Sequence, residues 1–278
     1  MKGTFVNKLA ALLLWLTLSL CLNAQISLGP SVSTFGVLAA STVTNSGPTI
    51  VTGNLGVSPG TAITGFTGIA PGGPGTVTGS INSANAFSGQ AQSELTTAYN
   101  IAAGLPSNGL NPADLGGTTV FAGVHTSNSA QPSLGITGTV TLDAQNNPNA
   151  IFVFQIASTL TTATGSNVLL INQASPANVY WQVGSSATLG STSSISGNIM
   201  ALASISFGTG AVLTGRALAR GGAVTMLSNS VSSPGGPGGP TPSPATPAPS
   251  SLILVATALV CAAIYQARAR LLKPFRRN

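Results

Sequence analysis

The sequence predicts a mainly β fold, a solenoid of short stacked coils, with one long α-helix packed alongside. An internal repeat is the first observation behind this prediction. Residues 186–203 align without a gap with residues 204–221 at an offset of 18, so that Gly197 falls on Gly215, and a third copy starts at Ala223. A coil of this length cannot bury its apolar face alone, so neighbouring coils must stack.

Regular turn signals are the second observation. A glycine after Thr or Ser, itself preceded by an apolar residue, marks a corner where the backbone can take a positive φ. Such corners end at Gly53, Gly65, Gly79, Gly138, Gly197 and Gly215. The strands expected between corners include residues 120–124, 138–142, 150–156 and 168–172.

A helical stripe is the third observation. Between Asn82 and Ala103, apolar residues recur at steps of three and four. We expect Ser80, Asn82 or Ser83 to cap the start of this helix, and Gly104 with Pro106 to end it. A long helix beside a solenoid must lie along the stack and bury its stripe there.

The two ends of the chain have compositions of their own. Residues 1–24 are typical of a secretory signal peptide, with Lys2 and Lys8 before an apolar stretch and a small-residue cleavage site. The solenoid domain is expected over 25–232, followed by a Pro/Gly-rich linker over 233–250. Residues 251–267 predict a short transmembrane or sorting helix, and residues 268–278 a basic cytoplasmic tail. The protein is therefore expected to be exported, at the cell surface or secreted, and anchored to the membrane by its C-terminal segment.

Charge and residue types exclude several functions. Between the two ends, the only charged residues are Glu94, Asp114, Asp143, Arg216 and Arg220, a net charge of −1. Nucleic-acid binding is not expected, because it needs clustered Lys and Arg. The only Cys residues, Cys21 and Cys261, lie in the two ends, so that neither a disulfide nor a metal site is expected in the domain. No cofactor and no small-molecule substrate is implied, and a monomer is expected.

Single residues that could carry chemistry have simpler interpretations. The lone His125 has no second nitrogen or thiol with which to form a triad or metal site, and a surface or loop position is expected for it. Trp181 is expected to pack in the core. We expect Arg216 and Arg220 to pair locally or to coat a surface. A polysaccharide lyase or hydrolase would need paired carboxylates, so an enzyme is not expected.

The outward positions of the coils are the candidate site. If Leu189, Phe207 and Met226 point inward, an outward column contains Thr188, Ser206 and Thr225. A second alignment, with Val168, Ile195, Leu213 and Val51 inward, gives an outward column containing Asn167, Ser194, Val212 and Ile50. Three positions earlier lie Thr164, Ser191, Thr209 and Gly47. A flat, uncharged array of hydroxyls and methyls is suited to ordering water into an ice-like layer. The alternative is that Thr and Ser here only satisfy the β-propensity of an exposed sheet.

Several sequence blocks together resemble the ice-binding domain of bacteria, fungi and diatoms over about residues 26–232. They are 53–61 (GNLGVSPGT), 98–106 (AYNIAAGLP), 114–119 (DLGGTT), 139–145 (TVTLDAQ), 149–155 (NAIFVFQ), 179–190 (VYWQVGSSATLG), 197–199 (GNI) and 215–220 (GRALAR). The C-terminal segment resembles bacterial sorting tails of the PEP-CTERM type, with Ala248-Pro249 where that family has Glu-Pro.

The first resemblance implies a discontinuous right-handed β-helix of triangular section, with adsorption to ice that inhibits ice growth and recrystallisation. The ice face of that family often carries Thr-Ala/Gly-x-Thr/Asn. Residues 164–167 (TGSN) match this motif, whereas residues 209–212 (TGAV) depart at Val212 and residues 191–194 (STSS) are approximate. The expected function is ice binding through a flat Thr/Ser/Asn face, with ice or ordered water and the membrane as partners. A non-enzymatic adhesin or structural surface module on the same fold is the alternative.

Overall fold

The computed structural model describes residues 26–70, 72–127 and 129–234. The chain divides into two units, Met1–Thr241 and Pro242–Asn278, and all described residues belong to the first. The predicted signal peptide, the linker after Pro234, the C-terminal helix and the basic tail lie outside the described residues. Within the described ranges, the structure has no helix that is both long and apolar enough to cross a membrane.

The strands of the described chain are short, pair in parallel and form two sheets. Sheet B, the smaller, has seven strands in the order β11 (Leu134–Ile136), β14 (Leu160–Thr162), β17 (Ala187–Leu189), β19 (Ile205–Phe207), β21 (Val224–Leu227), β2 (Thr42–Ser46) and β5 (Ala62–Thr64). Sheet A has fifteen strands: β1 (Phe35–Ala39), β3 (Ile50–Thr52), β4 (Asn54–Val57), β6 (Thr76–Val77), β7 (Ile81–Ser83), β8 (Gly109–Leu110), β9 (Thr119–Phe121), β10 (Gly123–Thr126), β12 (Thr139–Asp143), β13 (Phe152–Ile156), β15 (Asn167–Ile171), β16 (Val179–Val183), β18 (Ser194–Ala201), β20 (Val212–Ala219) and β22 (Ser230–Ser232).

Sheet A bends into two halves at a glycine corner. Strands β18 and β20 run through this corner with Gly197 and Gly215 paired and at φ values of 117° and 157°. A Cβ atom on Gly215 would lie 1.8 Å from the carbonyl oxygen of Gly197, so only glycine fits there. Strands β3, β6, β9, β12, β15 and β22 continue the first parts of β18 and β20, and we call this strip the open half of sheet A. The other strands of sheet A form the helix-covered half.

The observed register confirms the repeat. Strand β17 pairs with β19 so that Leu189 lies beside Phe207, and β18 pairs with β20 so that Ile195 lies beside Leu213. All four side chains are buried in one core that fills the solenoid. The two sheets and this core confirm a mainly β solenoid with three strips of strands around it.

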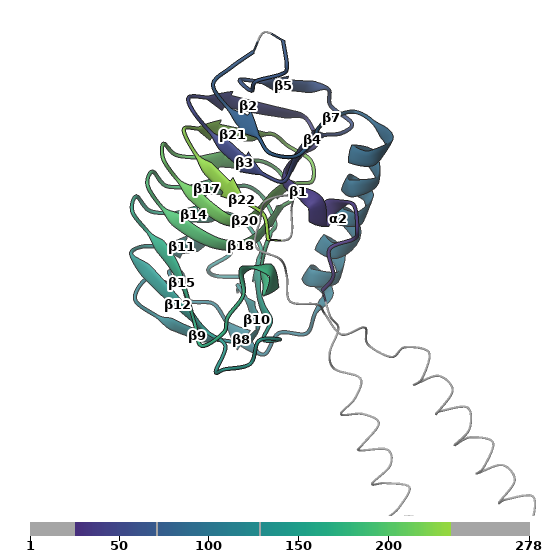
Figure 1. The fold of residues 1–278 in the computed structure, drawn as a ribbon. Coiled ribbons are helices and arrows are strands. Elements are labelled where there is room, and N and C mark those ends of the chain that lie inside the picture. Colours follow the sequence, from purple (N-terminus) through teal and green to yellow (C-terminus); the bar gives the residue numbers. More distant parts are fainter. Residues whose placement is uncertain (1–25, 71, 128, 235–278) are drawn as a thin grey trace, which may run out of the picture. The chain divides into compact units, whose positions relative to one another are not determined.

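The order of coils in space differs from their order in sequence. Strands β1, β2 and β3 near the N-terminus pair with β20, β21 and β22 near the C-terminus. The first coils therefore stack on the last, and the chain then passes along the helix α2 (Ala86–Gly104) to begin again at β8 (Figure 1). This arrangement is the discontinuous β-helix that the family resemblance implied.

Helix α2 begins later than predicted. Its N-cap is Asn85, whose side chain accepts a hydrogen bond from the amide of Ser88 at 2.9 Å. Residues 81–83 instead form β7, which pairs with β4, because their backbone groups complete the sheet before the chain turns. Four residues of the predicted stripe, Ala91, Leu95, Ala98 and Ala102, are buried against sheet A, in a cluster with Leu38, Tyr180, Met200 and Leu218. The first two do not follow it, because Ala84 precedes the helix and Phe87 is 40% exposed.

Glu94 ties α2 to the short 3-10 helix η1 (Val32–Thr34). Its Oε2 atom accepts hydrogen bonds from the amides of Ser31 and Val32 at 2.8 and 2.9 Å. Burial alone would raise the pKa of Glu94. These hydrogen bonds and one from Gln90 lower the pKa by more than burial raises it, so that it lies below its ordinary value.

A depressed carboxyl pKa makes stability depend on pH in a defined direction. The contribution of Glu94 is complete above the ordinary Glu pKa of about 4.3 and is lost as pH falls through the lower folded-state value. We expect Glu94→Gln to lower the melting temperature at pH 7 and to reduce the loss of stability between about pH 4.5 and 3. Melting curves across this pH range check it, and an unchanged pH dependence in the variant would contradict it.

Two other sequence expectations have clear outcomes in the fold. Trp181 is fully buried, which confirms the core prediction. Arg216 neither pairs with a nearby carboxylate nor coats a surface. It is 4% exposed and donates to the carbonyl of Ser33, to Oδ1 of Asn198 at 2.8 Å and to the carbonyl of Pro234. Arg220 is half-buried, and its guanidinium lies 4.7 Å from the ring centroid of Tyr99.

Candidate functional site

A single column of hydroxyl side chains runs along the outer surface of sheet B. Its members lie in register on six consecutive strands, and each is exposed. The residues immediately before and after each of them in the chain are buried, except Gly65. In order along the sheet, this hydroxyl column is Thr64, Thr44, Thr225, Ser206, Thr188 and Thr161.

The geometry of sheet B makes this column regular. Neighbouring strands lie about 4.8 Å apart, so the six hydroxyl residues extend over roughly 24 Å. Leu189, Phe207 and Met226 fill the space behind the sheet, and the parallel ladder fixes the backbone. The column is therefore a row of small polar side chains on a rigid support.

The nine predicted site residues do not lie on one flat face. Thr188, Ser206 and Thr225 belong to the hydroxyl column of sheet B, whereas Asn167, Ser194 and Val212 begin strands in the open half of sheet A. Between them the chain turns at residues with positive φ, which are Gly165 at 69°, Thr192 at 55° and Gly210 at 70°. Thr164, Ser191 and Thr209 precede these residues and lie on the corner between the two sheets.

The corner column also needs a correction at one end. Backbone hydrogen bonds from Gly165 to Ser191, from Thr192 to Thr209 and from Gly210 to Leu227 set its register. The column therefore runs from Thr164, Ser191 and Thr209 to Leu227 and then to Ser46, which pairs with Leu227. Gly47 was predicted here, but with φ at 88° it occupies the turn position that follows.

The column that begins the strands of the open half of sheet A is less uniform than the hydroxyl column of sheet B. Asn167, Ser194 and Val212 continue through Ser230, which the sequence alignment omitted, to Ile50. This half of sheet A exposes several large apolar side chains and also carries Asp143. They are Ile50 at 52%, Phe121 at 49%, Leu169 at 44% and Val212 at 37% exposed.

Sequence reasoning missed half of the hydroxyl column. Thr161 pairs with Thr188 at an offset of 27 residues, so the gapless offset of 18 could not find it. Thr44 lies beside Thr225 although 181 residues separate them, and Thr64 follows Thr44. The available signal was local, a Thr after an apolar residue in Val43-Thr44, Ile63-Thr64 and Leu160-Thr161.

One carboxylate lies at the end of sheet B. Asp114 forms an isolated bridge with Gly135, and its side chain accepts hydrogen bonds from the amides of Gly116 at 2.7 Å and Thr137 at 2.9 Å. Burial alone would raise the pKa of Asp114. Hydrogen bonds from the hydroxyl of Thr137 and from these two amides together lower the pKa by more, so that it lies below its ordinary value. Asp114 is thus an ionised turn-forming residue. In the described ranges, no three His, Cys, Asp or Glu side chains are grouped so that they could hold a metal ion.

Comparison with known proteins decides the family. A family model described as Ice-binding-like matches residues 37–232, which is most of the chain. The chain belongs to the ice-binding-like family. A curated relative, the ice-binding protein of Nostoc sp. (strain HG1), is 48% identical over 212 residues, which cover 75% of each chain.

Solved structures agree with this ice-binding-like assignment. The crystal structure of an ice binding protein from an Antarctic biological consortium has a TM-score of 0.69 at 49% identity, covering 74% of this chain and 90% of that one. The ice-binding protein of the Antarctic ascomycete Antarctomyces psychrotrophicus has a TM-score of 0.68 at 40% identity, with coverages of 73% and 96%.

Proposed function

We propose that this protein binds ice through the outer surface of sheet B, and that this adsorption inhibits ice growth and recrystallisation. The observation that carries the proposal is the hydroxyl column, six Thr or Ser side chains in register on six adjacent strands. Family membership and the names of its relatives, which are ice-binding proteins, support the same function.

The physical chemistry of the surface favours ordered water as the ligand. Threonine presents a hydroxyl that can hydrogen-bond to water and a methyl group that repels it. No strand residue of sheet B is charged, so its strands carry no ion with a radially oriented water shell. The fixed backbone lets the surface meet an ordered water layer without a further loss of conformational entropy.

Sheet B is the better candidate for the ice-binding surface, because its exposed side chains are more uniform than those of the open half of sheet A. The open half exposes Ile50, Val212, Leu169 and Phe121, which differ in size and interrupt its polar positions. In sheet B only Leu227, at the last position of β21, is a large exposed apolar side chain. The corner residues Thr164, Ser191 and Thr209 adjoin this surface and would extend it at one margin.

Ice recrystallisation is the direct test of the function. The purified full chain, at micromolar concentration in a frozen sucrose solution, is expected to keep ice crystals small for hours at a few degrees below freezing. Heat-unfolded protein at the same concentration is the control, because it has the same composition without the lattice. Equal crystal growth with folded protein, unfolded protein and buffer would contradict the proposal.

Neither adhesion nor catalysis has a specific observation in its favour. Trp181, the aromatic residue that a glycan-binding surface would have needed, is buried in the core. Glu94 and Asp114 serve backbone amides. We therefore propose a non-enzymatic role, in which Asp114→Asn combined with Asp143→Asn leaves the inhibition of recrystallisation unchanged.

We also propose that the protein is exported and that its C-terminal segment attaches it, at least transiently, to a membrane. The support is the sequence alone, the signal-like residues 1–24 and the apolar segment 251–267 with its basic flank. Fractionation of expressing bacteria tests both parts. Full chain in the membrane fraction and a truncation at residue 250 in the medium are expected, and full chain in the cytosol would contradict export.

A further inference from the structure

The interior of the solenoid contains a column of stacked aromatic rings that ends at a glycine. Trp181 stacks on Phe154 with centroids 4.2 Å apart and planes at 11°, and Phe154 stacks on His125 at 5.6 Å and 24°. These residues lie in register on β16, β13 and β10. On the next strand, β8, the residue paired with His125 is Gly109, which has no side chain to continue the stack.

His125 was expected on a surface or loop. It lies on strand β10, half-buried, and its ring packs on the fully buried Phe154. Its Nε2 atom lies 3.0 Å from the carbonyl oxygen of Phe121, to which it donates when that nitrogen carries the proton. A Cβ atom on Gly109 would lie 2.8 Å from Nδ1 of His125, so a side chain at that position would meet the imidazole.

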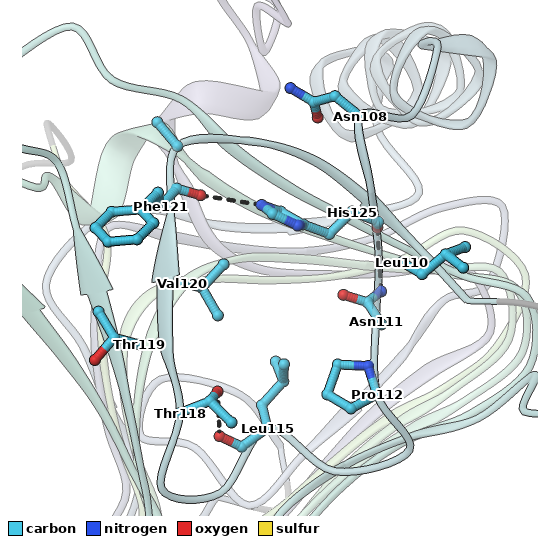
Figure 2. Close-up of a pocket in the computed structure, with 11 residues that line it drawn as sticks. Asn108, Leu110, Asn111, Pro112, Leu115, Thr118, Thr119, Val120, Phe121 and His125 are labelled. Atoms are coloured by element: carbon cyan, nitrogen blue, oxygen red, sulfur yellow. Dashed lines mark hydrogen bonds between the residues drawn. The ribbon is translucent and has the colours of Figure 1, made fainter.

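A hollow of about 330 Å³ adjoins the imidazole (Figure 2). Its wall includes the apolar side chains of Leu115, Val120 and Pro112. Leu110, 68% exposed, and Phe121, 49% exposed, also line it. A volume of this size is at the lower end of the range for small-molecule pockets.

A buried side chain, Asn111, presents one acceptor atom to the hollow. Asn111 is 4% exposed, its amide donates to the carbonyl of Thr126 at 2.8 Å, and its Nδ2 donates to the carbonyl of His125 at 3.1 Å. Its Oδ1 atom accepts no hydrogen bond from any residue that the structure describes, and it points into the hollow (Figure 2). The hydrogen bonds donated by Nδ2 and by the backbone amide of Asn111 hold this acceptor in place.

We propose that the hollow binds a flat aromatic molecule of one or two rings that carries an N–H or O–H donor. Its ring stacks on the side of His125 that faces Gly109 and so continues the column from Trp181 and Phe154. Its donor reaches Oδ1 of Asn111, to which no described residue donates. The inference is independent of the ice-binding proposal, because none of these residues belongs to the hydroxyl column.

Two probes that differ in one donor test this site without changing the protein. Indole and 1-methylindole are titrated into the ¹⁵N-labelled full chain, with amide and side-chain signals followed by NMR. Saturable shifts centred on Gly109, Asn111 and His125 are expected with indole. The dissociation constant of 1-methylindole is expected to be roughly fivefold larger than that of indole, because 1-methylindole cannot donate a hydrogen bond to Asn111.

Protein variants give a second, independent arm. His125→Leu replaces the planar imidazole ring by a branched aliphatic side chain, so indole is expected to bind at least about fivefold more weakly. Leu202→Ala removes an exposed apolar side chain that does not line the hollow and should bind indole as the wild type does. Absence of saturable shifts overturns the proposal, as do shifts spread over all exposed apolar residues or equal affinity for the two probes.

Discussion

Substitution of Thr188 by Tyr is expected to reduce the inhibition of ice recrystallisation by at least tenfold without unfolding the protein. Thr188 lies in the hydroxyl column with Thr161 and Ser206 on the adjacent strands. The bulky ring would hold the ice surface away from these neighbours and interrupt the lattice in its interior. A tenfold loss corresponds to about 1.4 kcal/mol of adsorption free energy. The smallest protein concentration that stops recrystallisation measures it.

Matched Thr→Tyr variants on the other surfaces make the result specific. Thr139→Tyr places the same ring on the open half of sheet A, and Thr97→Tyr places it on the exposed side of α2. Both should keep wild-type inhibition, and Thr209→Tyr at the corner should have an intermediate effect. If Thr139→Tyr abolished inhibition while Thr188→Tyr did not, the ice-binding surface would be the open half of sheet A.

Replacement of Arg216 by Met is expected to cause the largest loss of stability of any single substitution considered. Arg216 joins three distant parts of the chain through Ser33, Asn198 and Pro234. Burial lowers its pKa to about 10, so it is still charged at neutral pH. Methionine would leave these acceptors buried without donors, at about 1–3 kcal/mol each. We expect a loss of about 3 kcal/mol or more, and a melting temperature lower by roughly 6–12 °C.

Arg220→Met is the matched control, because it removes the same charge from a half-buried site. Its guanidinium stacks on Tyr99, a contact worth about 0.5–1 kcal/mol at such positions. The melting temperature should fall by no more than about 4 °C. Equal losses for the two arginines, measured by calorimetry, would contradict the central role given to Arg216.

Local sequence patterns were sufficient to predict the coils and the helix. The offset of 18 between residues 186–203 and 204–221 is the true register of β17–β19 and β18–β20, because these coils have equal length. The stripe of α2 was equally readable, because its spacing follows from helix geometry. Its cap was misplaced since Asn82 and Ser83 are also suitable capping residues, and only the pairing of β7 with β4 assigns them to a strand.

Local sequence patterns could not predict which distant coils stack on each other. The pairing of β2 with β21 brings Thr44 beside Thr225, and no periodicity links two segments so far apart. Coils of unequal length hid Thr161 from the alignment. The corner was hard to recognise in the coil of Thr192, because this residue, with φ at 55°, stands where the neighbouring coils have Gly165 and Gly210. The predicted single face was therefore divided between two sheets.

Direct adsorption to a single ice crystal tests the central claim most simply. The full chain carries a fluorescent label at its C-terminal end, away from the solenoid in sequence, and is mixed with Thr188→Tyr bearing a label of a second colour. A growing crystal is expected to incorporate the wild-type colour and to exclude the variant. Exclusion of both proteins would contradict ice binding, and equal incorporation of both would contradict the assignment of the ice-binding surface to sheet B.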